Sequence, residues 1–302
     1  MQHFITMNWS ADTQKICTSL MQQMRLPESF ADIVRNIYLP LAQIIINKQQ
    51  QQPLLVNING AQGTGKSTCT TFLKQIIESE FGCKAAELSI DDFYYTRSER
   101  QQLSSQVHPL FITRGVPGTH DAALIENVLD ALMNRQSCKV PRFNKSVDDR
   151  CSDEGWSDYS EPVDFILFEG WCNNSPAQSP AELVQPVNEL EAEEDAEGIW
   201  RHYANEQLKD YHQRLFKHAD MSIMLNASDF ERIYEWRSLQ EQKLKASSSD
   251  QRHVMNDNEL KRFIQHYERI SRHTLSHLPH TADVVLPVAE DHSITGIIQN
   301  NV

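Results

Sequence analysis

The chain has 302 residues, of which 40% are hydrophobic and 23% are charged, and its formal net charge is −13. This length and composition are typical of a globular protein with a large core, and the negative charge argues against nucleic acid or an anionic membrane as a partner. The six cysteines include no C-x-x-C pair, which indicates reduced thiols and a cytoplasmic location, and no apolar run approaches the ~20 residues of a membrane span.

The N-terminal part of the chain is predicted to be helical. Apolar residues recur at roughly helical intervals over residues 10–47, and the first residues lack the basic region and apolar core of a signal peptide. A polar, glutamine-rich break at 47–53 follows. We therefore predict a helical extension at 1–52, packed on the core, and a nucleotide-binding domain at 53–302.

A phosphate-binding loop is predicted after this break. The sequence "NINGAQGTGKSTCTT" at 57–71 contains the spacing G-x-x-x-x-G-K-[ST]. An apolar run at 53–59 predicts a buried strand before the loop, and apolar residues at helical spacing predict a helix after it. The alternative is a chance glycine turn, which would need neither element. The strand, loop and helix together therefore favour a nucleotide site.

The chemistry of this loop is that of a phosphate cradle. Its glycines let consecutive N–H groups point at anionic oxygens, and the helix N-terminus adds partial positive charge. Lys66 can reach the β- and γ-phosphates, and the Ser67 hydroxyl can bind Mg²⁺. The predicted ATP-binding residues are Gly60, Ala61, Gln62, Gly63, Thr64, Gly65, Lys66, Ser67 and Thr68.

Two carboxylates follow the second predicted strand, at residues 85–90. Asp91 and Asp92 come directly after it, and ligands of parallel α/β sheets bind at the carboxyl ends of the strands. A carboxylate placed there can accept the proton of an attacking hydroxyl or bind Mg²⁺. The alternative is that the pair only caps the segment that follows.

Further helices and strands alternate along the rest of the chain. Residues 96–120 are polar and are predicted to be irregular, and Asp121 is placed to cap an amphipathic helix at 121–134. The remaining predicted elements are strands at 139–143, 163–170, 221–226 and 282–288, and helices at 228–247 and 257–278. This alternation predicts an α/β fold, with a mainly parallel sheet covered by helices on both faces.

A third carboxylate ends the strand at 163–170. "FILFEGW" places Glu169 where a Walker-B acid would stand, and the alternative is a strand-end carboxylate that pairs with a lysine. The D-x-x-G and N-K-x-D segments of GTPases are absent, and we identify no sensor elements of a motor or AAA-type ATPase. These patterns favour a kinase.

Several segments resemble a known family. "GAQGTGKST", "LSIDDFYYT" and "FILFEGW" together resemble the phosphoribulokinase and uridine kinase superfamily of P-loop small-molecule kinases. More specific segments, within about residues 30–290, are similar to the D-glycerate 3-kinase family. They are "RGVPGTHD" (114–121), "PRFNKSVDDR" (141–150), "NELEAEED" through "WRHYANEQLKDY" (188–211), "WRSLQEQKLK" (236–245) and "FIQHYERISRHTL" (263–275). One departure is Asn144, where the family pattern has Asp.

The resemblance implies catalytic and metal-binding roles. It makes Asp91 the general base, Glu169 a metal-linked strand-end glutamate, and Asp92 a water-mediated metal contact. It also implies a helical lid near residues 228–250 that brings Arg237 over the phosphates, where the charge would stabilise the transition state and help exclude water.

The resemblance also implies where the acceptor binds. Arg114 could pair with a substrate carboxylate, and Thr119, His120 and Asp121 could bond substrate hydroxyls. The alternatives are that the glycines of this segment form turns and that Asp121 only caps its helix. Two further residues could clamp the substrate or the γ-phosphate or could simply lie on the surface: Lys145 and Arg150.

The sequence therefore predicts an ATP- and Mg²⁺-dependent kinase of a small hydroxylated metabolite, with D-glycerate as the first choice. One alternative is another acceptor, namely a nucleoside, pantothenate or a sugar phosphate. A second alternative is an ATP-binding regulatory protein without turnover, which would not need the intact Lys66, Ser67, Asp91 and Glu169. The sequence leaves the oligomeric state open.

Overall fold

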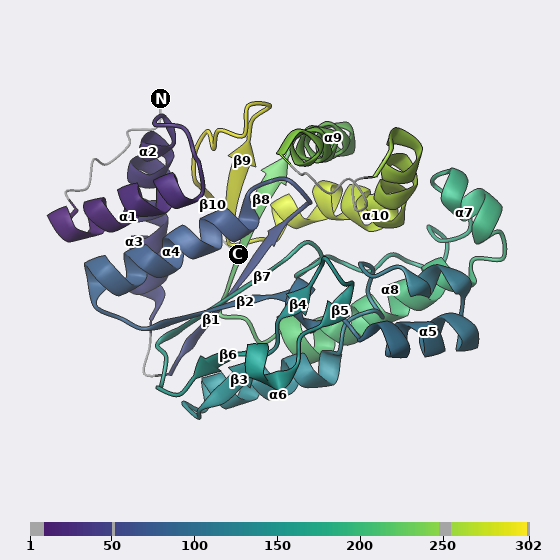
Figure 1. Ribbon diagram of the computed structural model, residues 1–302, viewed down its shortest axis with the longest axis horizontal. Helices are drawn as coiled ribbons and strands as arrows, with labels where there is room; N and C mark the ends of the chain where they lie inside the picture. The colour runs from purple at the N-terminus through teal and green to yellow at the C-terminus, as the bar shows by residue number, and fades with distance from the viewer. Residues whose placement is uncertain (1–8, 50–51, 248–254, 301–302) are drawn as a thin grey trace.

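The computed structural model describes residues 9–49, 52–247 and 255–300. Its centre is a sheet with the strand order β10-β9-β8-β1-β7-β2, in which all neighbours are parallel except β10 and β9 (Figure 1). The strands are β1 Leu54–Gly60, β2 Ala85–Ser89, β7 Phe165–Gly170, β8 Met221–Ala227, β9 Val284–Val288 and β10 Ile298–Gln299. The predicted α/β fold with a mainly parallel sheet is confirmed.

Helices cover both faces of this sheet. They are α1 Ala11–Gln23, α2 Phe30–Ile33, α3 Leu39–Lys48, α4 Lys66–Phe81, α5 Arg97–Gln106, α6 Ala122–Met133, α7 Glu189–Glu194, α8 Ile199–Tyr211, α9 Phe230–Ser247 and α10 Asp257–His277. Alternate residues of β1 face two cores: Val56 packs on the side of α4, and Leu55 on the side of α6 and α8. Within the described ranges, no helix has both the length and the apolarity to cross a membrane.

The carboxyl ends of the parallel strands form the edge where the candidate site lies. β1 is buried along its whole length, because it lies between β8 and β7. The register pairs Glu169 of β7 with Ile58 of β1 on one side and with Ser89 of β2 on the other. The segments that follow β1, β2 and β7 therefore emerge side by side at one edge.

The N-terminal helices pack on the nucleotide-binding part. Cys17 of α1 and Leu41 of α3 belong to the same hydrophobic cluster as β1 and α4, and Thr13 Oγ1 donates to Ser79 Oγ of α4 at 2.9 Å. The division of the chain at residue 52 stays a prediction.

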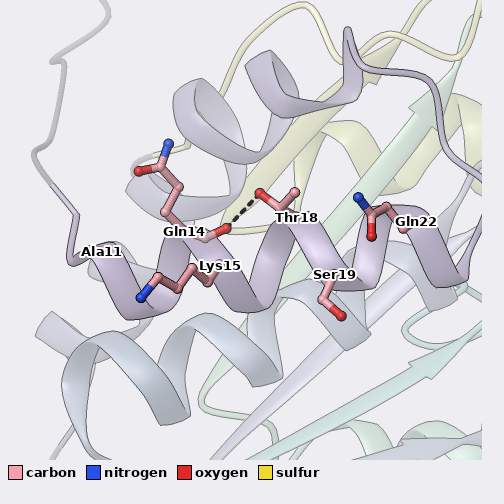
Figure 2. Close-up of a pocket in the computed structure, with 6 residues that line it drawn as sticks. All are labelled: Ala11, Gln14, Lys15, Thr18, Ser19 and Gln22. Atoms are coloured by element: carbon pink, nitrogen blue, oxygen red, sulfur yellow. Dashed lines mark hydrogen bonds between the residues drawn. The ribbon is translucent and has the colours of Figure 1, made fainter.

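The outer face of α1 is polar and carries a shallow pocket (Figure 2). Thr18 Oγ1 donates to the Gln14 carbonyl there at 2.8 Å. The residues that line this pocket are Ala11, Gln14, Lys15, Thr18, Ser19 and Gln22. None of them belongs to the predicted site.

The prediction that residues 96–120 are irregular was wrong, because α5 lies within them. This helix begins with a capping box in which Thr96 Oγ1 accepts from Glu99 N and the Glu99 carboxylate accepts from Thr96 N. The residue that α5 buries is Arg100. A helix that buries an arginine has no apolar stripe, so the periodicity of the sequence did not indicate it.

The predicted strand at 139–143 is divided at Pro141. β3 Cys138–Val140 pairs with β6 Ser157–Tyr159, whereas β4 Phe143–Asn144 pairs with β5 Asp149–Arg150. Proline has no N–H to donate, which ends the first ladder. The second pair forms the β4–β5 hairpin, residues 143–150, which contacts the candidate site.

Candidate active site

The phosphate loop joins β1 to α4. Gly63 and Gly65 have φ angles of 86° and 88°, in the left-handed region that favours glycine. Gly65 is the N-cap of α4 and no side chain caps this helix, which leaves its first N–H groups to an anion. Thr64 Oγ1 donates to the Ala61 carbonyl at 2.8 Å and supports the curled loop. This geometry suits phosphate oxygens at a helix N-terminus.

Lys66, Ser67 and Glu169 meet at the end of this loop. Ser67 Oγ donates to Glu169 Oε1 at 2.7 Å, and Lys66 Nζ lies 3.9 Å from Glu169 Oε2. Glu169 is 4% exposed. The fold thus brings together three predicted residues that are far apart in the sequence.

The polar atoms around Glu169 fit a magnesium ion. In the described part of the chain, Glu169 Oε2 is buried and has no hydrogen-bond partner, and the Ser67 hydroxyl lies next to the other carboxylate oxygen. Among all the residues that the structure describes, there is no group of three or more His, Cys, Asp or Glu side chains that could hold a metal ion. Mg²⁺ does not require such a group, because it binds one or two carboxylates together with phosphate oxygens and water.

Both carboxylate oxygens of Asp91 are hydrogen-bonded. Tyr94 Oη donates to Oδ1 at 2.8 Å, and Lys145 Nζ donates to Oδ2 at 2.7 Å. Burial raises the pKa of Asp91, but the charges of Lys145 and Lys66 and these two hydrogen bonds outweigh it, so the pKa lies well below its usual range. Asp91 is therefore ionised at neutral pH, as a proton acceptor must be.

Asp92 faces a different set of partners. Arg142 donates to its Oδ2 at 2.7 Å, and the backbone N–H of Phe143 donates to its Oδ1 at 3.0 Å. Both oxygens therefore hold the start of the β4–β5 hairpin. The structure does not bring Asp92 to the Ser67–Glu169 pair through any described hydrogen bond.

Arg114 is also held by the β4–β5 hairpin. Its guanidinium forms an ion pair with Asp148 and lies over the ring of Phe143, with Cζ 5.4 Å from the centroid. The other oxygen of Asp148 pairs with the buried Arg100 at 2.9 Å. The Arg114 side chain is 26% exposed.

Aromatic rings connect Arg114 with Asp91. Burial raises the pKa of both Tyr94 and Tyr267; the Asp91 carboxylate raises each of them further, and the Arg114 guanidinium lowers them. The geometry gives the link: Tyr94 Oη donates to Asp91 Oδ1, the Tyr94 and Phe143 rings lie 5.3 Å apart, and the Arg114 guanidinium lies over the Phe143 ring. A carboxylate and a guanidinium are thus linked through Tyr94 and Phe143.

Tyr267 of α10 also fixes the backbone beside Arg114. Its hydroxyl donates to the Arg114 carbonyl at 3.3 Å. Gly115 has a φ of 142°, and a Cβ at this position would collide with the Tyr267 hydroxyl. Trp171 Nε1 donates to the Gly115 carbonyl at 3.0 Å. Glycine is therefore required here by both backbone conformation and close approach.

The Thr119 side chain forms its hydrogen bonds within its own loop. Its hydroxyl accepts from Gly115 N at 3.0 Å and donates to the Val116 carbonyl at 2.7 Å, and the residue is fully buried. The hydroxyl that was predicted to bond the substrate thus stabilises the segment in this structure.

His120 is a buried, neutral imidazole. Burial lowers its pKa to about 4, although the Asp91 carboxylate acts in the opposite direction. Its ring stacks on Tyr94 at 4.5 Å, and its Nδ1 lies 3.2 Å from Tyr211 Oη. Within the described part of the chain, Nε2 has no hydrogen-bond partner. Of Thr119, His120 and Asp121, His120 thus has a buried side-chain nitrogen that no described residue bonds.

Asp121 and Arg150 form a second anchor of the hairpin. Asp121 Oδ1 accepts from Leu124 N at 3.0 Å, which confirms the predicted cap of α6. Its Oδ2 lies 3.4 Å from the Arg150 guanidinium, which also donates to the Tyr94 carbonyl at 2.9 Å. Arg150 is only 12% exposed.

The predicted lid corresponds to α9, and residues 248–250 of the prediction lie outside the described residues. Trp236 is 4% exposed, and its Nε1 donates to the Glu290 carbonyl at 3.0 Å. A Cβ at Gly63 would lie 3.0 Å from Trp236 Cβ, so α9 touches the phosphate loop. Arg237 Cζ lies 5.6 Å from the centroid of the Phe263 ring.

Four residues of this site were not predicted from the sequence: Tyr94, Arg142, Asp148 and Tyr267. Arg142, Asp148 and Tyr267 each act on a predicted residue from another segment, as Arg142 does on Asp92 across 50 positions, whereas Tyr94 bonds Asp91 three positions away. "PRFNKSVDDR" contains two of them, so the resemblance had marked the segment but not their partners.

Comparisons with known proteins agree with this geometry. No family model matches the chain. A relative from Schizosaccharomyces pombe, named as the uncharacterized kinase mug58, is 30% identical over 233 residues, which cover 73% of this chain and 80% of that protein. A chloroplastic D-glycerate 3-kinase from Arabidopsis thaliana is 30% identical over 226 residues, or 71% of this chain and 46% of that protein.

The chain belongs to the D-glycerate 3-kinase family. The resemblance stated from its motifs is thereby confirmed, within the phosphoribulokinase and uridine kinase-like P-loop kinases. The relatives are kinases by name, so this family member is an ATP-using kinase whose substrate is a small molecule.

Solved structures show the same fold. A D-glycerate 3-kinase from Cryptococcus neoformans has a TM-score of 0.73 at 24% identity, over 87% of this chain and 99% of that chain. The YGR205w protein has a TM-score of 0.70 at 20% identity, over 96% of this chain and 99% of that chain. At these identities the similarity establishes the P-loop kinase architecture and not the acceptor.

Proposed function

We propose that this kinase transfers the γ-phosphoryl group of ATP, in the presence of Mg²⁺, to a hydroxyl of D-glycerate or a closely similar hydroxy acid. The observation that carries the proposal is that Asp91 and the Arg114 guanidinium are linked through two aromatic rings: Tyr94 donates to Asp91, its ring packs on Phe143, and Arg114 lies over Phe143. A short hydroxy acid has the matching groups, a hydroxyl with a proton to lose and a carboxylate to bind. The name of the Arabidopsis relative supports this choice of acceptor.

In this proposal the residues that bind ATP and Mg²⁺, which we call the nucleotide half of the site, have separate roles. The N–H groups of residues 60–68 and the Lys66 ammonium hold the phosphates, and Ser67 and Glu169 hold Mg²⁺, which would neutralise phosphate charge. Arg237, carried by α9, adds a positive charge on the side of Tyr267, whose pKa it lowers against the effect of burial. Such a charge stabilises the in-line transition state and helps exclude water.

The acceptor half supplies the proton acceptor and the orientation. Asp91 takes the proton of the attacking hydroxyl, and Arg114 binds the carboxylate through a charge-assisted pair. His120 contributes Nε2 as a neutral partner for a substrate oxygen. The polar groups of four residues, Asp92, Thr119, Asp121 and Arg150, are occupied within the protein, and we assign them to holding this half in place.

Pantothenate is the second candidate acceptor. A pantothenate kinase from Streptococcus gordonii is 28% identical over 156 residues, which cover 45% of this chain, and pantothenate also carries a carboxylate and hydroxyls. A nucleoside site would need aromatic rings that stack on the base, and the candidates are Phe93, Tyr94 and Tyr95. Phe93 and Tyr94 are buried in packing, which leaves only Tyr95 partly exposed and makes a nucleoside less well matched. The cytoplasmic location stays a prediction.

The proposal is tested by ADP release with ATP and Mg²⁺ against D-glycerate, L-glycerate, pantothenate, uridine, ribulose 5-phosphate and no acceptor. We expect stimulation by D-glycerate, and an Asp91→Asn protein that still binds ATP but transfers about 10²–10⁴-fold more slowly, the usual contribution of a general base. Asp158→Asn, at an exposed position of β6, is the matched control. Stimulation by pantothenate alone would mean that pantothenate, and not D-glycerate, is the acceptor. No stimulation by any compound would support an ATP-binding regulator.

A further inference from the structure

Four charged residues in and next to the β4–β5 hairpin pair with residues of the candidate site. The pairs are Arg142–Asp92, Lys145–Asp91, Asp148–Arg114 and Arg150–Asp121. Two of these are anchors, because backbone hydrogen bonds accompany them: Phe143 N donates to Asp92, and Arg150 donates to the Tyr94 carbonyl.

The other two pairs occupy the groups that an acceptor would need. Lys145 Nζ lies 2.7 Å from Asp91 Oδ2, on the carboxylate that would receive the hydroxyl proton. The carboxylate of Asp148 pairs with the guanidinium of Arg114, where a substrate carboxylate would bind. Lys145 is 60% exposed and can move into solvent. Asp148 is 36% exposed, but its Oδ2 and its carbonyl oxygen also accept from the buried Arg100, so an acceptor carboxylate has to displace only Oδ1 from Arg114 while Oδ2 stays on Arg100.

We propose that the β4–β5 hairpin is a competitive plug, in which Lys145 and Asp148 occupy Asp91 and Arg114 until an acceptor that carries both a hydroxyl and a carboxylate displaces them. This inference rests on the proposed function and sharpens it, because it assigns the acceptor to the class of short hydroxycarboxylates. A neutral polyol has a hydroxyl that can replace Lys145 on Asp91, but it has no carboxylate that could replace Asp148 on Arg114. Water, like a neutral polyol, lacks the carboxylate that is needed to displace Asp148 from Arg114.

The plug has a chemical consequence for ATP that is bound without an acceptor. In transfer, the acceptor oxygen bonds to the γ-phosphorus, the bond to the β-bridging oxygen breaks, ADP leaves with the electron pair, and the hydroxyl proton passes to Asp91. In hydrolysis, a water molecule takes the acceptor's place and the products are ADP and inorganic phosphate. Lys145 on Asp91 blocks the proton acceptor that this water would use.

The first test is ADP release from ATP and Mg²⁺ by the full chain without acceptor. Lys145→Met should raise this rate about fivefold, the upper end expected for an exposed ion pair, and Lys145→Arg, which keeps the charge, should not. Lys139→Met, at an exposed position of β3, is the matched control. An unchanged rate in Lys145→Met overturns the plug.

The second test separates competition from positioning at Arg114. Asp148→Asn keeps a carbonyl oxygen for Arg100 but removes the charge that pairs with Arg114. The plug predicts a KM for D-glycerate that falls about fivefold, with the KM for ATP unchanged and no change for glycerol as acceptor. A KM for D-glycerate that rises would show that Asp148 positions Arg114, and would overturn the proposal.

The two tests also separate this inference from the proposed function. Failure of every hydroxy acid to stimulate the wild type would refute the proposed function. ADP release without acceptor can be measured whether or not a hydroxy acid is the substrate. This measurement therefore tests the role of Lys145 in either case.

Discussion

The nucleotide half and the acceptor half of the candidate site are built in different ways. The nucleotide half is mostly backbone from one stretch, residues 60–68, held between a buried strand and a helix, with Glu169 added from β7. The acceptor half is mostly side chains from separate segments. Its ion pairs join residues 50, 54, 34 and 29 positions apart: Arg142 to Asp92, Lys145 to Asp91, Arg114 to Asp148, and Arg150 to Asp121.

This difference indicates where the specificity of the kinase lies. Backbone N–H groups at a helix N-terminus recognise phosphate in any nucleotide-binding relative, so the nucleotide half can stay the same while the acceptor changes. Side-chain pairs can be altered one at a time without disturbing the sheet. Apart from the proton acceptor Asp91, we therefore expect substitutions in the acceptor half to act on the KM for the acceptor, and substitutions in the nucleotide half to act on transfer.

Of the substitutions that follow, Lys66→Met in the nucleotide half should have the largest effect. Removing this positive charge should slow phosphoryl transfer about 10²–10³-fold, the usual cost of losing one electrostatic donor to a transition state. The rate is measured as ADP release at saturating acceptor. Lys74→Met, on the same helix in an ion pair with Glu78, is the control. Equal losses in both variants would mean that the helix and not the charge is responsible.

Gly115→Ala should damage the acceptor half selectively. A methyl group collides with the Tyr267 hydroxyl at a φ of 142°, and strain together with overpacking should lower the free energy of unfolding by about 3 kcal/mol. Gly82→Ala has a positive φ with no atom within 4 Å, so it should lose only about 1–2 kcal/mol. Urea unfolding measures both. If the two variants lose the same stability, the contact with Tyr267 is not a constraint.

Arg114→Gln should separate the two halves by kinetics. Loss of a charge-assisted bond to the acceptor carboxylate should raise the KM for D-glycerate about 10–100-fold, while the KM for ATP stays unchanged. Arg35→Gln, at an exposed position of the N-terminal helices, is the control. A change in the KM for ATP of similar size would contradict the assignment of Arg114 to the acceptor.

The smallest effect is a loss of stability in mild acid. Burial lowers the pKa of His120 to about 4 in the folded state, against 6.5 for the free side chain. Between these pH values the unfolded state binds more protons, so stability is complete above pH 6.5 and falls as the pH drops toward 4. The slope from one such histidine is at most about 1.4 kcal/mol per pH unit.

Urea unfolding at several pH values measures this slope in His120→Gln. In this variant the unfolding free energy should depend less steeply on pH. His266→Gln should reduce the same pH dependence by a separate amount, because burial also lowers the pKa of His266 to about 4. The same substitution at the exposed His218 controls for the loss of a histidine. An unchanged slope in His120→Gln would show that this imidazole is not kept neutral by burial.

Some elements were predictable because their signals are local. Hydrophobic runs indicated β1 and β7, and Asp121 indicated the start of α6, where it accepts from Leu124 N. α5 was missed because it buries Arg100 instead of an apolar stripe. The arginine is stable there because the carbonyls of Tyr95 and Ile112 accept its hydrogen bonds, and no periodicity in the sequence shows such partners.

The sequence by itself determined the phosphate loop, the α/β class of the fold and the carboxylates at the strand ends, because each depends on neighbouring residues or on a spacing of a few positions. Only the tertiary structure decided which charges meet. It paired Asp92 with Arg142 and Lys145 with Asp91, and it linked Arg114 to Asp91 through the rings of Phe143 and Tyr94. The physical reason is that ion pairs and buried phenols select partners by distance in space, and that distance is fixed only when the sheet and its helices have packed.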